Sequence, residues 1–285
     1  MKQIMQGLLL VLILCCTQPA HAWWFNQGSD CNTNCKQYEC SCNALHCGAF
    51  DVQLQAGVDP IIWRSKAEVI SGSFPFPSPT NPTLVFFNSP SYKRLFHVPW
   101  IVGGQVGYAW SDNVRFFVEF NYMQAKGKDN VSVSTATTPV LAATFTVHKY
   151  KLFDAYVGGR YYWDRWCNRI AFFLGGKIGL THHKNTKVDL AVGIPLLPPV
   201  SLILTKVPAI NHNTGISGGV NAGFDICFCG NWSVVITGEV VASQGPKIAN
   251  NIPLSQVVGQ YNAISFGNIG AELRFPVTAA IRYTF

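Results

Sequence analysis

The sequence is poor in charge. Lys, Arg, Asp and Glu make up 12% of the 285 residues, whereas soluble domains contain about 25%. The net charge of +7 is spread along the chain, so it does not indicate a nucleic-acid partner. Metal-binding, phosphate-loop and dinucleotide-binding motifs are also missing, and we therefore expect no cofactor.

Long apolar runs are missing beyond the N-terminus. The run from Leu8 to Leu14 precedes the small-residue site Ala20-His21-Ala22, which predicts an export signal over residues 1–22. That run is too short to cross a bilayer as a helix. The next most apolar stretch, residues 188–204, is broken by Asp189, Gly193 and three prolines. Because lipid accepts only helices and closed sheets, a membrane protein with this sequence must be a β-barrel.

Segments that alternate apolar and polar residues are abundant. Eight are found, at residues 50–58, 100–110, 114–124, 151–163, 170–181, 216–226 and 232–242 and in a last segment that ends at Phe285. Each is near the roughly 9–11 residues that a tilted strand needs to cross the bilayer core. The connections alternate between short and long, which is typical of short periplasmic turns and long external loops.

The predicted fold class is therefore all-β: an antiparallel, up-and-down transmembrane β-barrel of about eight strands over residues 49–285. Residues 23–48 form a cysteine-rich periplasmic segment before the barrel. A further pair of strands around residues 61–69 and 83–87 would raise the count to ten and widen the lumen.

The strands are two-faced, and a charge on the lipid face is costly, so we place the charged face inward. The predicted lumen-lining charges are Arg115, Glu119, Lys151, Asp154, Arg160, Lys177, Asp225, Glu239, Glu272, Arg274 and Arg282. Their near-equal signs predict ion pairs. Phe117, Tyr156 and Phe173 also point inward on this scheme, and an eight-stranded barrel is narrow. A sealed plug and an open pore are thus both consistent with the pattern.

Aromatic residues gather where strands meet the short turns. Tyr108, Trp110, Tyr161, Trp163, Trp166, Trp232, Tyr283 and Phe285 lie there, and such residues prefer the headgroup level of a membrane. The final strand alternates up to the terminal Phe285, but Pro276 cannot donate a ladder hydrogen bond, which predicts a bulge or irregular pairing there.

This closing strand resembles the C-terminal signature of bacterial outer-membrane proteins, in which the last aromatic residue, here Phe285, is read by the assembly machinery. With the export signal and barrel pattern, the chain resembles the small OmpA/OmpX-like eight-stranded type. The resemblance implies location in the cell outer membrane, with outer-membrane lipid and the barrel-assembly machinery as partners.

Ten cysteines are present, of which Cys15 and Cys16 leave with the signal. The disulfide candidates are Cys31, Cys35, Cys40, Cys42, Cys47, Cys167, Cys227 and Cys229, all placed at the periplasmic rim of an exported protein. Intramolecular bridges, intermolecular bridges that tie barrels into an envelope lattice, and a zinc site with His46 are three readings. The cysteine content resembles that of chlamydial-type major outer-membrane porins.

Three other features could carry chemistry or binding. The G-x-S-x-G match at residues 215–219 begins an alternating strand with no helix after it, so we interpret its glycines as room for packing rather than as a nucleophile elbow. His182, His183 and Lys184 form either a basic rim that meets lipid phosphate or a site that modifies lipid. The apolar loop 188–204 forms a hairpin above the membrane, a cap over the lumen or an adhesive surface.

The sequence therefore predicts a non-enzymatic outer-membrane barrel, an envelope component with porin activity as the first functional hypothesis. A surface adhesin, or a disulfide-cross-linked structural protein, is the alternative, with other cysteine-rich envelope proteins or host-surface ligands as partners. A rim enzyme that modifies lipid is the third hypothesis.

Overall fold

The structure is a computed structural model that describes residues 47–64, 70–78, 81–87, 92–134, 142–163, 170–193, 201–229, 231–247, 264–265 and 271–285. The predicted export signal and most of the predicted segment 23–48 lie outside these residues. In the described part, the helix is α2 (Tyr92–Leu95), and no helix there is long and apolar enough to cross a membrane.

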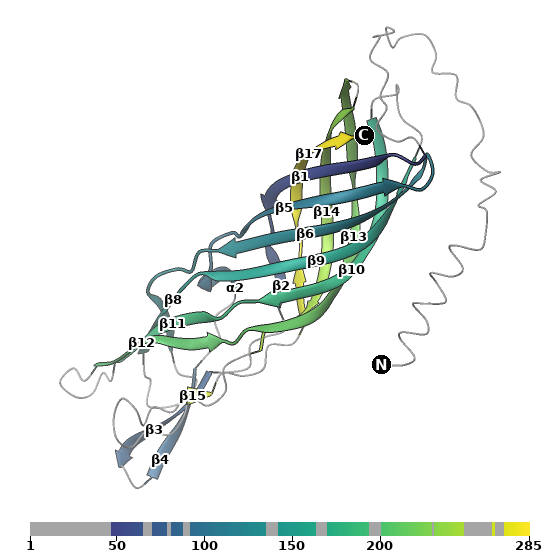
Figure 1. Ribbon diagram of the computed structural model, residues 1–285. Helices are drawn as coiled ribbons and strands as arrows, with labels where there is room; N and C mark the ends of the chain where they lie inside the picture. Colours follow the sequence, from purple (N-terminus) through teal and green to yellow (C-terminus); the bar gives the residue numbers. More distant parts are fainter. Residues whose placement is uncertain are drawn as a thin grey trace, which may run out of the picture. The chain divides into compact units, whose positions relative to one another are not determined.

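Eight strands, one of them interrupted, form a closed wall. The wall strands are β1 (Phe50–Val58), β5 (Trp100–Ala109), β6 (Val114–Ala125), β9 (Tyr150–Tyr162), β10 (Ile170–His183), β13 (Asn213–Cys229), β14 (Trp232–Gln244) and, as one interrupted strand, β16 (Ala271–Arg274) with β17 (Val277–Thr284). Each pairs antiparallel with its neighbours in that order, and β17 pairs with β1 to close the ring. The fold class predicted from the sequence is confirmed. Figure 1 shows β1 beside β17, next to the C-terminus.

The first and last strands form the seam. Their ladder runs from Asp51 opposite Thr284 to Val58 opposite Val277 without a break in register. The backbone N–H of Phe285 donates to the carbonyl of Phe50 over 2.8 Å. The two ends of the barrel chain are therefore hydrogen-bonded to each other at one rim.

Pro276 divides the last wall strand, but its effect is smaller than a bulge against β14. One register pairs β14 with β16 and with β17 across the break, and the N–H of Glu239 donates to the carbonyl of Pro276 over 2.9 Å. The irregularity lies on the other side, where the pairing of β16 with β2 (Ile61–Arg64) shifts between Leu273 and Arg274. The irregular pairing predicted at Pro276 is therefore found on the side of β2 and not on the side of β14.

The ten-strand alternative is wrong for this structure. β2 continues β1 beyond Asp59 and Pro60 and pairs with β16 as β1 pairs with β17. β3 (Ile70–Ser78) and β4 (Asn81–Phe87) instead form a hairpin, which with β15 (Ile264–Ser265) makes a separate three-stranded sheet. These segments add no strand to the wall, so the lumen keeps the width of an eight-stranded barrel.

Two long connections also fold into strands. β7 (Val131–Ser134) and β8 (Ala142–Val147) come from the connection after β6, and β11 (Thr186–Gly193) and β12 (Ser201–Ile210) from the connection after β10. They form one four-stranded sheet in the order β12-β11-β8-β7. We call this the outer sheet. The described residues of the apolar loop 188–204 lie in β11 and β12, which pair as a hairpin, one of the structures predicted for this loop.

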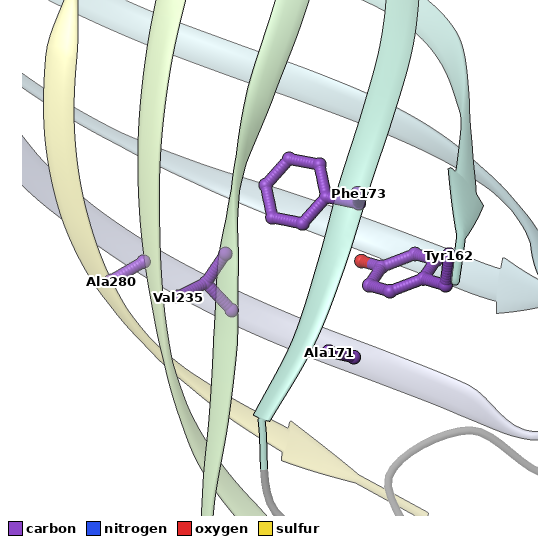
Figure 2. Close-up of a cluster of buried hydrophobic side chains, with 5 residues drawn as sticks. All are labelled: Tyr162, Ala171, Phe173, Val235 and Ala280. Carbon is purple, nitrogen blue, oxygen red and sulfur yellow. The ribbon is translucent and has the colours of Figure 1, made fainter. Parts of the chain in front are cut away.

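The interior is filled by side chains. Tyr162, Ala171, Phe173, Val235 and Ala280 are at most 4% exposed and form a buried cluster inside the wall. Figure 2 shows these residues projecting from different strands into the same interior space. The Tyr162 and Phe173 rings lie 5.3 Å apart between centroids. Apolar packing therefore occupies the lumen near the rim that carries the short turns.

Glycines on the inner face make room for the large inward side chains. A Cβ atom built on Gly175 would lie 2.7 Å from Asn221 Oδ1 and 2.8 Å from Arg160 Cγ. At the next residue, Gly176, the nearest atom would be 3.6 Å away. Because side chains alternate along the strand, Gly175 faces the crowded interior and requires glycine, whereas Gly176 faces outward and has space for a side chain.

These adjacent glycines give a matched test. We expect Gly175→Ala to lower the free energy of unfolding by roughly 1–3 kcal/mol through overpacking, and Gly176→Ala to leave it unchanged or raise it slightly. Urea unfolding in phospholipid vesicles, followed by tryptophan fluorescence, measures both. Equal effects of the two substitutions would contradict the inward packing of Gly175.

Candidate functional site

The lumen contains nearly all the charge of the barrel wall. Of the predicted lumen-lining charges, ten have 6% exposure or less: Arg115, Glu119, Asp154, Arg160, Lys177, Asp225, Glu239, Glu272, Arg274 and Arg282. They come from six of the wall strands and point into one interior. An eight-stranded barrel therefore encloses them in a space that side chains can fill.

Lys151 is the exception, and its prediction as a lumen residue is wrong. Tyr150, Leu152 and Asp154 are buried on the inner face of β9, whereas Lys151 is half-buried and has the opposite parity. Because side chains alternate along a strand, Lys151 and Asp154 cannot both face the lumen. Lys151 belongs to the outer face, at the end of β9 that follows a long connection.

Lys177 joins two carboxylates from opposite directions. Its ammonium group lies 2.7 Å from Glu119 Oε1 on β6 and 2.5 Å from Glu239 Oε2 on β14. The ammonium group also sits over the Tyr156 ring, 4.3 Å from its centroid. Neither β6 nor β14 is adjacent to β10, so these pairs cross the lumen.

Arg274 spans the full width of the barrel. It donates to Asp154 on β9 through both terminal nitrogens, at 2.9 and 3.1 Å. It also donates to Asp59 over 2.8 Å and to the Tyr156 hydroxyl over 2.9 Å. β16 and β9 lie opposite each other in the ring of eight. This fork-like pairing therefore ties the two sides of the wall together.

A second pair of arginines lies nearer the rim of the short turns. Arg115 on β6 pairs with Asp51 on β1, and Arg282 on β17 pairs with Asp225 on β13. Both guanidinium groups also reach the Tyr162 hydroxyl, at 3.3 and 3.5 Å. One buried phenol thus joins two ion pairs from different parts of the wall.

Arg160 is held by rings rather than by carboxylates. Its guanidinium carbon lies 4.7 Å from the Phe117 centroid and 4.6 Å from the Phe173 centroid, which is cation–π distance. Among the described residues, none of its three side-chain nitrogens has a hydrogen-bond partner. The inward position predicted for Phe117, Tyr156 and Phe173 is also where these side chains lie, each 4% exposed or less.

A polar cluster closes the lumen at the other end. The Tyr150 hydroxyl lies 2.8 Å from His183 Nδ1 and donates to Glu272 Oε2 over 3.2 Å. His183 Nε2 lies 3.2 Å from the carbonyl oxygen of Gln244. His183 is fully buried, whereas His182 faces outward and contacts Thr214 Oγ1 at 2.9 Å. The two histidines therefore lie on opposite sides of the wall and do not form one site.

Several lumen residues were not predicted. Asp51 and Asp59 are the carboxylates of two ion pairs described above. Gln53 and Gln55 form a hydrogen-bonded chain with Asn121, which lies on the predicted inward face of β6, with 3.0 Å from Gln53 to Gln55 and 2.7 Å from Gln55 to Asn121. Asn121 then donates to Glu119 over 2.5 Å. The signal was present in β1, whose alternate residues are polar.

The outer face is apolar and has aromatic residues at both ends. At the rim of the short turns, Trp110, Tyr161, Trp163, Trp232 and Phe285 are exposed, and Trp232 stacks edge-on against Tyr283 at 4.8 Å. Trp166, also predicted there, lies outside the described residues. At the opposite end, the Tyr122 ring lies 5.4 Å from Trp100 and 4.9 Å from Phe153. Such belts fit the two headgroup levels of a membrane.

The other predicted sites are placed as follows. Ser217 of the G-x-S-x-G match is buried within β13, so it is not on a strand-to-helix elbow. Cys47 is exposed and its thiol donates to the carbonyl of Trp110 over 3.2 Å, while Cys227 is buried. Cys31, Cys35, Cys40, Cys42 and Cys167 lie outside the described residues, as does the side chain of Cys229. Disulfide formation stays a prediction.

A closed ring of eight antiparallel strands, an apolar outer face with aromatic belts and a charged interior together define a small transmembrane β-barrel of the outer-membrane type. The chain's place in this class rests on the strand ladder and the two-faced wall.

No protein-family model matches the chain, and no curated protein matches it. Solved structures of outer-membrane barrels do. Neisserial surface protein A is 14% identical over 84% of this chain and 99% of its own, with a TM-score of 0.39. Outer membrane protein OprG from Pseudomonas aeruginosa is 12% identical over 85% and 98%, with a TM-score of 0.40. The attachment invasion locus protein of Yersinia pestis is 8% identical over 84% and 100%, with a TM-score of 0.34.

The Lys177 cluster provides a stability test. We expect Lys177→Met to lower the free energy of unfolding by about 3–5 kcal/mol, because it leaves two carboxylates buried without their cation. Lys151→Met, on the outer face, is the matched control and should change stability by less than about 0.5 kcal/mol. Urea titration in vesicles measures both. A Lys177 variant as stable as the control would show that the cluster is not a structural ion pair.

Proposed function

We propose that this protein is a sealed outer-membrane barrel that serves as an envelope component by holding the outer sheet at the cell surface, where the sheet binds partners. The observation that carries the proposal is the set of ion pairs that crosses the lumen. Arg274 bridges opposite walls, and Lys177 bridges β6 to β14. Together with the aromatic rings around Arg160, these side chains occupy the path that a solute would take.

The outer sheet supports the binding part of this proposal. It is assembled from two connections that are distant in sequence, β7–β8 and β11–β12. Connections that only join wall strands need no such order, whereas loops that carry function are held by a rigid scaffold. Host-surface ligands and other cysteine-rich envelope proteins are the partner classes that the sequence suggests.

A second candidate function is passive conduction of small solutes. It is favoured by buried polar atoms that have no hydrogen-bond partner within the described residues, among them both amide atoms of Gln105 and of Asn221. Such atoms are usually paired with water when no protein group is near, so this candidate function expects water molecules beside them in the lumen. A continuous line of water molecules would allow a narrow channel. A conductance measurement distinguishes this channel from the sealed barrel.

The conductance test has a matched control. Wild-type protein in a planar bilayer should give no discrete current steps. Replacing the inward rings with Phe117→Ala and Phe173→Ala should produce steps, because it removes the packing on both sides of Arg160. Phe116→Ala with Phe172→Ala deletes the same atoms from the exposed outer face and should stay silent. Discrete steps from the wild type would favour the channel over the sealed barrel.

The outer sheet depends on a clasp at Asp189. The N–H of Lys206 on β12 donates to Asp189 Oδ1 over 2.6 Å, and His148 Nε2 lies 3.1 Å from Oδ2. Lys206 has a φ of 56°, a conformation that bulky residues adopt only when their surroundings hold it. The hydrogen bond from the Lys206 backbone lowers the pKa of Asp189 below the ordinary value of an aspartate.

This clasp makes the outer sheet sensitive to acid. A lowered pKa in the folded state means that the stabilisation is complete above the ordinary aspartate pKa of about 3.9 and is lost as the pH falls through the folded value. We expect amide exchange in β11 and β12, corrected for its intrinsic rate, to accelerate below that pH. Asp189→Ala should show the faster exchange already at neutral pH. Unchanged protection in this variant would contradict the clasp.

The same variant tests binding. Vesicles that carry the wild-type barrel should attach to a panel of immobilised host-surface glycans, and vesicles with Asp189→Ala should attach less. Barrel integrity is checked by heat-dependent gel migration. Full attachment by the variant would show that binding does not require an ordered outer sheet.

A further inference from the structure

A groove of about 640 Å³ lies on the outer face of the wall, within the roughly 300–1,000 Å³ of ligand pockets. It crosses β5, β6, β9, β10 and β13 in the half of the barrel next to the long connections. Its lining side chains on the outer face include Val102, Phe120, Tyr122, Phe153, Ala155 and Leu180.

The groove exists because one small residue interrupts a row of large ones. Ala155 on β9 is paired with Phe120 on β6 and with Leu180 on β10. Phe120 is 62% and Leu180 51% exposed, so both project from the wall while Ala155 does not. The result is a hollow with apolar sides, where an otherwise convex wall would meet lipid.

Polar groups lie at the end of this hollow that is next to the long connections. On the outer face of the wall strands, which the structure describes, Lys151 is the one charged residue. The N–H of Lys184 donates to the carbonyl of Lys151 over 3.0 Å, so the two lysines are backbone neighbours. The Lys184 ammonium group lies 4.9 Å from the centroid of Phe153, a lining residue. His182 and Thr214, also lining residues, lie beside them.

We propose that this groove binds an acyl chain of a phosphorylated lipid of the outer leaflet, with the phosphate held by Lys151 and Lys184. The apolar hollow matches the chain, and two lysines with hydrogen-bonded backbones, next to the aromatic residue Phe153, match the phosphate. Lys151 can hold the phosphate because it faces outward, which it could not do from the lumen. The site does not depend on whether the lumen conducts or the outer sheet binds a partner.

The test uses the full mature chain released into mild detergent and native mass spectrometry with added lipid. Wild-type protein should retain one molecule of a doubly phosphorylated, acylated glycolipid in preference to zwitterionic phospholipid. Lys151→Gln with Lys184→Gln should weaken that binding by about fivefold per lysine, since each cation near a membrane surface contributes about 1 kcal/mol. Binding of the zwitterionic lipid should not change.

A filling substitution tests the hollow. Ala155→Phe should weaken retention of the phosphorylated lipid by about tenfold or more, because it excludes buried methylene groups of the chain. Ala222→Phe is the matched control, since Ala222 is an exposed small residue of β13 that lies outside the groove. Heat-dependent gel migration verifies that both variants are folded.

Four results would overturn the proposal. Equal retention of the doubly phosphorylated glycolipid and the zwitterionic phospholipid by the wild type would contradict the phosphate site. Equal loss with Ala155→Phe and Ala222→Phe would remove the groove. Complete displacement of the glycolipid by millimolar inorganic phosphate, with no effect of Ala155→Phe, would show a free-anion site in place of a lipid site. A protein dimer that replaces bound lipid, and that Ala155→Phe abolishes, would assign the groove to a second copy of the chain.

Discussion

The ladder between β1 and β17 is the contact on which the rest of the structure depends. In hydrocarbon, each backbone N–H and C=O group must be paired within the protein, so a sheet with two free edges is not stable there. The eight-residue register of the seam removes both edges at once. Closing the ring with eight strands then fixes a narrow lumen, and the narrow lumen determines which inward side chains can coexist.

The interior charges follow from that width. A buried cation or anion without a partner is costly, and a lumen this narrow brings residues from opposite walls within bonding distance. Arg274 and Asp154 therefore meet across the barrel. Large inward side chains also crowd the backbone, and inner-face glycines such as Gly175 relieve that crowding. Side chains that form ion pairs across the lumen leave little space for a solute. The structure of the wall therefore supports binding by the outer sheet better than it supports conduction.

The strands were predictable because two local signals agree. Period-two alternation marks each strand, and the rhythm of short and long connections orders them, so β1 was predicted at the bounds that the structure has. The failure at Lys151 came from treating each charge separately, since Asp154 three residues later already fixes the parity of β9. The pairs across the lumen were not predictable, because they depend on the stagger between strands. A hairpin in the apolar loop was one of the predictions, but the pairing of β11 with β8 was not predicted, because these strands are separated by about forty residues of sequence and carry no local signal of the pairing.

The hydrogen bond from Phe285 to Phe50 joins the last residue of the chain to the first residue of the wall. The ring of strands therefore cannot close before the last wall strand has paired with the first. Until the final strand has arrived, the first strand keeps one unpaired edge, and the lumen charges on β16 and β17 lack their partners. A barrel without this strand would expose the edge of β1 to hydrocarbon, where an unpaired backbone group is costly.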